Sequence, residues 1–185
     1  MLVCVSNGQR EAPVNAARMS RLARQAIRHL RITTPGTLAI TFIGAQRMRT
    51  LNKRFMHHDR VTDVLSFRYH GESTVGEILI APSQARSYAK RHGIPYAEEL
   101  SRYVVHGLLH WLGHEDRTRA QQRKMRTRED RLLAQCIWKV PSPASQVTRS
   151  RGPLRPGADG AGSVRRGEDR WGGAAAGPAK PGDVE

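Results

Sequence analysis

The feature that most constrains the fold is a long apolar segment, residues 96–112, that carries two histidines near its end. Its apolar residues recur at the spacing of one helix face, at Leu100, Val104, Leu108 and Leu112. Because apolar residues cover most of its surface, we expect this helix to be largely buried. Histidines on such a helix need specific partners, which makes them the first candidates for a functional site.

The two histidines, His106 and His110, lie four residues apart. On a helix this spacing places both side chains on one face about 6 Å apart, so both can bind one metal ion, as in the HExxH sites of zinc enzymes. The residue after the first histidine is Gly107, however, and not the glutamate that is the general base in those enzymes. We expect Gly107 to leave open space beside the metal. The pair alone is also typical of ordinary core or surface histidines.

A helix break follows the second histidine. Gly113 predicts the end of the helix, because the residue just beyond a helix usually adopts the left-handed conformation. The chain can then fold back and bring a third ligand to the metal. Three candidates follow the glycine directly: His114, Glu115 and Asp116.

Before residue 141 the hydrophobic pattern alternates between strand-like and helix-like segments. Strands are expected at residues 2–6, 37–43 (a buried strand), 64–67 and 77–80. Helices are expected in a stretch opened by Pro13 and at residues 45–55, 83–92, 96–112 and 119–134. This order predicts a single α+β domain, with a small mixed sheet packed against helices and the metal site at the end of a central helix.

The chain carries 31 Lys and Arg against 16 Asp and Glu, a net charge of +15. Residues 141–185 hold seven basic and five acidic residues, so +13 of the excess belongs to residues 1–140. A domain with this imbalance repels itself, and binding a polyanion would relieve the repulsion. A basic surface that only aids solubility is the alternative.

Residues 141–185 also hold nine of the 17 glycines and six of the 10 prolines. This composition predicts a disordered tail, rich in Pro, Gly, Ala and Arg, after a folded domain at residues 1–140. Cys4 and Cys136 form no CxxC pair, no apolar run reaches the length of about 18 residues that a membrane span needs, and the N-terminus lacks the basic region of a signal peptide. We therefore expect a cytoplasmic protein with two free thiols and no membrane contact, and a single bridge between the two cysteines is the alternative.

The stretch HGLLHWLGHED, residues 106–116, resembles the signature HGxLHLxGYDH of the YbeY family of bacterial endoribonucleases. Two further segments are similar to that family: LNKRFMHHDRVTDVLSFRY at residues 51–69 and GEILIAP at residues 76–82. The likeness covers roughly residues 35–135. Chance produces an HxxxH pair, but not a TDVLSF strand at the right distance before it.

This resemblance implies a single-strand-specific, zinc-dependent endoribonuclease that acts in ribosomal RNA maturation, at the 3′ end of the small-subunit RNA, and in ribosome quality control. It implies one Zn²⁺ ion, held by His106 and His110. The family's third ligand histidine falls on Asp116 without a gap, and we assign this carboxylate as third ligand, with His114 as its rival. The implied partner is ribosomal RNA, with ribosomal proteins or a ribosome-associated GTPase as further candidates.

Phosphodiester cleavage requires charge stabilisation on the phosphate and an activated nucleophile. We expect Arg60 to clamp the phosphate, and the general base stays open between His114, Glu115 and a hydroxide on the zinc. The arginine that family members often have in this loop falls on Met56 here. Asp63 could orient a ligand histidine or cap a backbone N–H, and we favour the cap.

Two other functions stay open. A zinc peptidase is suggested by the HxxxH helix and disfavoured by Gly107. A ribosome-associated RNA-binding module without catalysis would use the metal only to pin the helix and the turn. The charge of residues 1–140 favours either RNA function over the peptidase.

Overall fold

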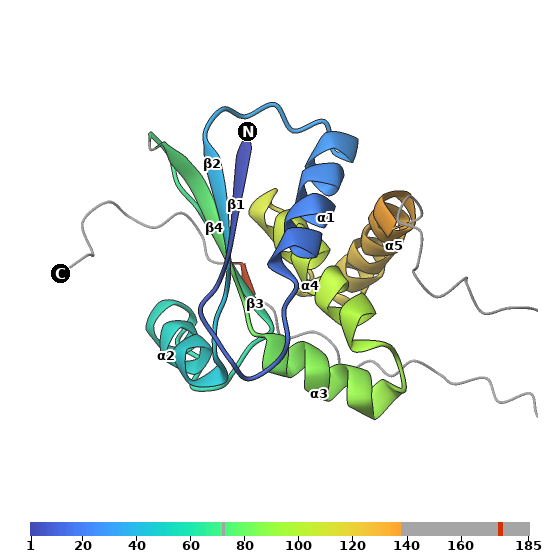
Figure 1. Ribbon diagram of the computed structural model, residues 1–185. Helices are drawn as coiled ribbons and strands as arrows, with labels where there is room; N and C mark the ends of the chain where they lie inside the picture. The colour runs from blue at the N-terminus through green and yellow to red at the C-terminus, as the bar shows by residue number, and fades with distance from the viewer. Residues whose placement is uncertain (72, 138–173, 176–185) are drawn as a thin grey trace, which may run out of the picture.

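The computed structural model describes residues 1–71, 73–137 and 174–175 (Figure 1). The four strands and five helices predicted from the sequence are all present, in the predicted order. They are β1 (Leu2–Asn7), α1 (Ala16–His29), β2 (Thr37–Phe42), α2 (Ala45–Met56), β3 (Val64–Arg68), β4 (Thr74–Ile80), α3 (Pro82–His92), α4 (Tyr96–Trp111) and α5 (Arg119–Ile137). Apart from the short strand β5 (Ala174–Ala175), the predicted tail lies outside the described residues.

The strands form one mixed sheet in the order β1-β2-β4-β3-β5. β1 and β4 pair with β2 in parallel, and β3 pairs with β4 antiparallel. The predicted α+β class with a small mixed sheet is therefore confirmed. The parallel pair β1–β2 needs a crossover connection, which α1 supplies, whereas the antiparallel pair β3–β4 is joined directly.

Helices cover the two faces of the sheet unequally (Figure 1). One face packs against α1 and α4, behind which α5 completes the larger core, whereas α2 packs on the other face against residues of β3 and β4. For this reason the prediction of a buried strand at residues 37–43 holds for one face only. Leu38, Ile40 and Phe42 are fully buried, while Thr37, Ala39 and Thr41 on the opposite face are half-buried.

Two elements begin three residues away from their predicted starts. α1 begins at Ala16 and not at Pro13, because the side chain of Asn15 accepts a hydrogen bond from the backbone N–H of Arg18 (2.9 Å) and caps the helix. β4 begins three residues earlier than expected, because Gly76 lies inside the strand. A side chain at Gly76 would collide with the indole of Trp111, so the glycine admits this ring to the sheet.

Within residues 1–71 and 73–137, no helix combines the length and apolar character needed to cross a membrane. The two cysteines are free: Cys4 lies exposed on β1, and Cys136 is buried in α5.

Gly107 faces the sheet. A Cβ at this position would lie 2.5 Å from Cγ2 of Ile78 and 3.1 Å from Cγ1 of Val64. The prediction that Gly107 leaves open space beside the metal is therefore wrong: the missing side chain instead lets α4 approach β3 and β4. The hydroxyl of Ser66 donates a hydrogen bond to the Gly107 carbonyl (3.0 Å) at the same contact.

Replacing Gly107 by alanine should therefore destabilise the fold. The added methyl group must push α4 away from Ile78, which we expect to lower the free energy of unfolding by about 1–3 kcal/mol. Urea denaturation followed by circular dichroism measures this change. Gly8→Ala is the matched control, since a Cβ at Gly8 meets only the carbonyl oxygen of Phe42, at 3.7 Å. Equal stability of the two variants would contradict this account of Gly107.

Candidate metal centre

The C-terminal end of α4 turns the chain back toward the helix. Gly113 has φ 90°, as its predicted role after the helix requires, and its N–H donates to the carbonyl of His110 (2.8 Å). The N–H of His114 donates to the carbonyl of Leu109 (3.0 Å). These two bonds form a Schellman motif, which satisfies carbonyls at the helix end and fixes the direction of the following residues.

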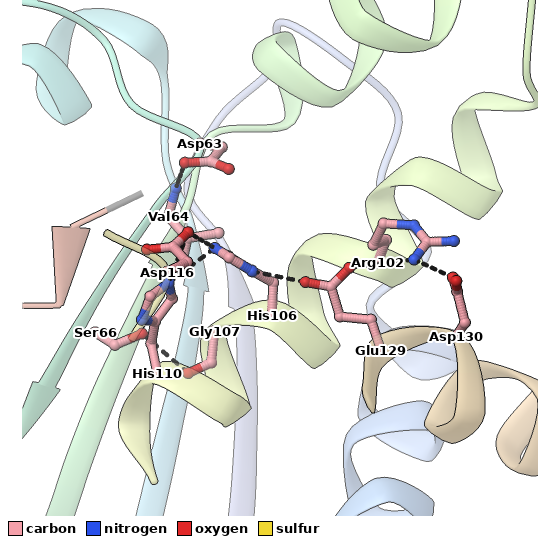
Figure 2. A network of polar contacts seen from close by, with 10 residues as sticks. All are labelled: Asp63, Val64, Ser66, Arg102, His106, Gly107, His110, Asp116, Glu129 and Asp130. Atoms are coloured by element: carbon pink, nitrogen blue, oxygen red, sulfur yellow. Dashed lines mark hydrogen bonds and ion pairs between the residues drawn. The ribbon is translucent and has the colours of Figure 1, made fainter. Parts of the chain in front are cut away.

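The turn brings Asp116 beside the two histidines of α4 (Figure 2). The Nε2 atoms of His106 and His110 lie 2.9 Å apart, and Asp116 Oδ2 lies 3.8 Å and 3.7 Å from them respectively. All three side chains are at least 95% buried. Their ligand atoms therefore converge on one point inside the protein.

This arrangement fits a metal ion. Zinc binds imidazole nitrogen and carboxylate oxygen at about 2.0–2.2 Å, which at tetrahedral angles separates two ligand atoms by roughly 3.3–3.6 Å. The three separations in this cluster bracket that value. Asp116 Oδ2 is buried and has no hydrogen-bond partner among the residues that the structure describes. Because a buried carboxylate oxygen without a partner is costly, a cation between the three groups would stabilise it.

Glu129 holds one of the histidines from the side opposite the cluster (Figure 2). This fully buried residue of α5 places Oε1 2.8 Å from Nδ1 of His106. The contact places the proton of His106 on Nδ1, so that Nε2 presents its lone pair to the cluster. Arg102, one turn before His106 on α4, donates to Glu129 Oε2 (3.1 Å) and also pairs with Asp130.

The charges of the cluster compensate one another. Burial lowers the pKa of His106, but the hydrogen bond and charge of Glu129, with the charges of Asp63 and Asp116, outweigh it and raise this pKa above its usual value. Burial raises the pKa of Asp116, but attraction to His110 and His106 outweighs it and lowers this pKa. The site therefore favours an ionised carboxylate beside imidazoles.

The other candidate site residues lie outside this cluster. Nδ1 of His114 lies 2.8 Å from Nη1 of Arg128, and Glu115 is exposed next to it. Both line a pocket of about 350 Å³ beside the turn. Burial and the charge of Arg128 lower the pKa of His114. Arg60 is exposed in the loop before β3, where its carbonyl accepts a hydrogen bond from the side chain of Asn52 (2.8 Å).

Two further expectations concern the loop before β3. Met56, which aligns with the family's loop arginine, is the last residue of α2 rather than a loop residue, and it packs against the smaller core. Asp63 Oδ1 accepts hydrogen bonds from the backbone N–H of Val64 (2.9 Å) and the hydroxyl of Thr62 (3.0 Å). The favoured role of Asp63 as a backbone cap is therefore confirmed.

Sequence reasoning missed Glu129 and Arg102. One signal was available for Glu129: it stands at helical spacing between Met125 and Leu133, an acidic residue within an apolar stripe. Arg102 precedes His106 by four residues and shares its helix face. Neither pattern identifies the partner, because the contact joins two helices that meet only in the folded chain.

A sequence profile of the family described as Endoribonuclease YbeY matches residues 4–137. The chain belongs to the YbeY family. Among its relatives, endoribonuclease YbeY of Flavobacterium psychrophilum is 34% identical over 99 residues, which cover 53% of this chain and 71% of that protein. Endoribonuclease YbeY of Chlamydia felis is 30% identical over 141 residues, which cover 71% of this chain and 88% of that protein.

The fold has a solved counterpart. A solution structure of a Thermotoga maritima protein superposes with a TM-score of 0.52 at 19% identity and covers 78% of this chain and 100% of that one. At this identity the likeness supports the fold alone. Family and geometry together make the chain a YbeY-family endoribonuclease with a buried His-His-Asp group suited to a metal ion.

Glu129→Gln should weaken metal binding without unfolding the protein. The amide keeps the shape of the side chain but loses the charge that orients and polarises His106, so we expect zinc affinity to fall about 10–100-fold. Competition with a chromophoric chelator measures this affinity. Asp130→Asn is the matched control, because Asp130 pairs with the same arginine but is about half exposed and does not contact His106. Equal affinities of the two variants would overturn the orienting role of Glu129.

Proposed function

We propose that this protein is a zinc-dependent endoribonuclease specific for single-stranded RNA. The observation that carries the proposal is the buried convergence of His106, His110 and Asp116 in a chain of the YbeY family. The excess positive charge of residues 1–140 supports an RNA substrate, because each phosphate contact releases counterions from the RNA.

The donor set supports zinc as the ion. Two imidazoles and one carboxylate are typical of catalytic zinc sites, in which three protein ligands leave one position for water or substrate. A bound zinc ion would supply Lewis-acid stabilisation of phosphate charge and lower the pKa of water. In our proposal His106, His110 and Asp116 are the three ligands, and Glu129 fixes the orientation of the first.

The residues around the turn would bind and orient the RNA. An arginine can only donate, so its contact with His114 Nδ1 leaves the proton of a neutral His114 on Nε2. His114 is then suited to donate a hydrogen bond to a phosphate oxygen, which leaves the exposed Glu115 as the side chain better suited to accept a proton. Arg60 would hold the phosphate from the loop before β3.

The peptidase alternative is disfavoured by the packing of Gly107. The general base of an HExxH enzyme occupies this position, and here even one carbon atom would meet Ile78 at 2.5 Å. A glutamate could not be introduced without moving α4 away from the sheet. The position therefore serves packing and contributes no proton-transfer group.

Membership of the YbeY family supports a proposal for the cellular setting. We propose that residues 1–140 form one catalytic domain that acts in the cytoplasm on ribosomal RNA, at the 3′ end of the small-subunit RNA, and contributes to ribosome quality control. Ribosomal proteins or a ribosome-associated GTPase would be its protein partners. The free cysteines, Cys4 and Cys136, suit a reducing compartment.

Asp116→Ala should remove most of the bound zinc, with a loss of affinity greater than the roughly 100-fold that changing a residue hydrogen-bonded to a metal ligand can cause. His114→Ala should keep its zinc, because His114 contacts Arg128 rather than the cluster. Metal analysis of both purified variants after dialysis, together with RNA cleavage, tests the assignment. Full zinc content in Asp116→Ala, or zinc loss in His114→Ala, would show that the third ligand is wrongly assigned.

Removal of the metal should abolish RNA cleavage. We expect the purified protein to cut an unstructured ribosomal RNA fragment, to stop cutting after its metal is stripped, and to recover when zinc is added back. Gel analysis of the end-labelled RNA measures each state. RNA that binds but is never cut in either state would replace this proposal with the non-catalytic RNA-binding module.

A further inference from the structure

One exposed face of α1 consists of arginines. Arg21, Arg24 and Arg28 lie three and four residues apart, which places them in one stripe along the helix. The sequence of α1 contains no acidic residue. Within the described part of the chain, none of the three forms an ion pair with a carboxylate, so their charges are not neutralised by the fold.

These arginines border a groove between α1 and β1. The groove has a volume of about 410 Å³, and its remaining lining is Met1, Val3, Gln25 and Ile27. Its floor is thus largely apolar and its rim is basic. A groove of this kind suits a ligand that combines anionic groups with flat apolar surfaces.

The groove lies away from the metal centre. β1 is one edge of the sheet, and α1 packs beside it (Figure 1). The metal centre lies where α4 packs on β3 and β4, on the far side of β2. A ligand in the groove would therefore not enter the coordination sphere of the metal.

We propose that the groove between α1 and β1 binds the phosphodiester backbone of single-stranded RNA, as an anchoring site separate from the metal centre. This inference rests on the proposed ribonuclease function. Arg21 and Arg28 are seven residues apart, or about 10 Å along the helix, so the stripe can contact more than one phosphate of an extended strand. The guanidinium group of an arginine can donate two parallel hydrogen bonds to a phosphate, and the apolar floor accommodates sugars and bases.

The test compares two variants with the same loss of charge. Arg21→Gln/Arg24→Gln removes two rim charges, and Lys90→Gln/Arg91→Gln removes an exposed basic pair from α3. The probe is a fluorescent, unstructured 30-nucleotide RNA, whose affinity for the zinc-loaded full chain is measured by anisotropy at several salt concentrations. Melting temperatures check that both variants fold, and gels report cleavage in the same samples.

We expect the groove variant to bind RNA about tenfold more weakly. Its plot of log binding constant against log salt concentration should be less steep by about 1.4, whereas the α3 variant should change little in either quantity. Equal effects of the two variants would show that only overall charge matters and would overturn the proposal. Equally tight binding of a labelled polyglutamate peptide to the groove would also overturn the proposal, because the groove would then fit an acidic protein segment. RNA bound through the groove but not cut would refute the ribonuclease and leave the groove assignment standing.

Discussion

The close contact between α4 and the sheet at Gly107 is the constraint on which the rest of the site depends. With no side chain at this position, the helix lies against Ile78 and Val64 and buries both histidines within the protein. A larger residue would lift the helix and displace His106 and His110 together. The glycine at the position of the catalytic glutamate of HExxH zinc helices is thus a structural requirement of this fold, and the chemistry must come from elsewhere.

Burial at this depth is tolerated because opposite charges alternate through the site. Arg102 pairs with Glu129, Glu129 contacts His106, and the imidazoles face Asp116. Each buried charged group has an opposite or polarisable neighbour, as the cost of burying an isolated charge requires. The last group in this chain of alternating charges is the Asp116 carboxylate. Its Oδ2 has no hydrogen-bond partner among the described residues, and a cation bound there would neutralise its charge.

The sequence predicted the elements well because most of them carry clear periodicity or motif residues. It also located the turn at Gly113, whose left-handed conformation is a local property, and the candidate cluster that follows it. The role of Gly107 was predicted wrongly, because it depends on which face of α4 meets the sheet. That face is decided by contacts with β3 and β4, not by the sequence of α4 itself. The contact of Glu129 was missed for the same reason, since α5 meets α4 only in the folded chain.

The ligand set can be tested by a crystal structure of the zinc-loaded protein, with anomalous differences measured at the zinc edge. We expect one zinc peak bound by Nε2 of His106, Nε2 of His110 and a carboxylate oxygen of Asp116, with His114 still directed toward Arg128. A peak bound by His114 in place of Asp116, or no zinc between the two helix histidines, would contradict this ligand set.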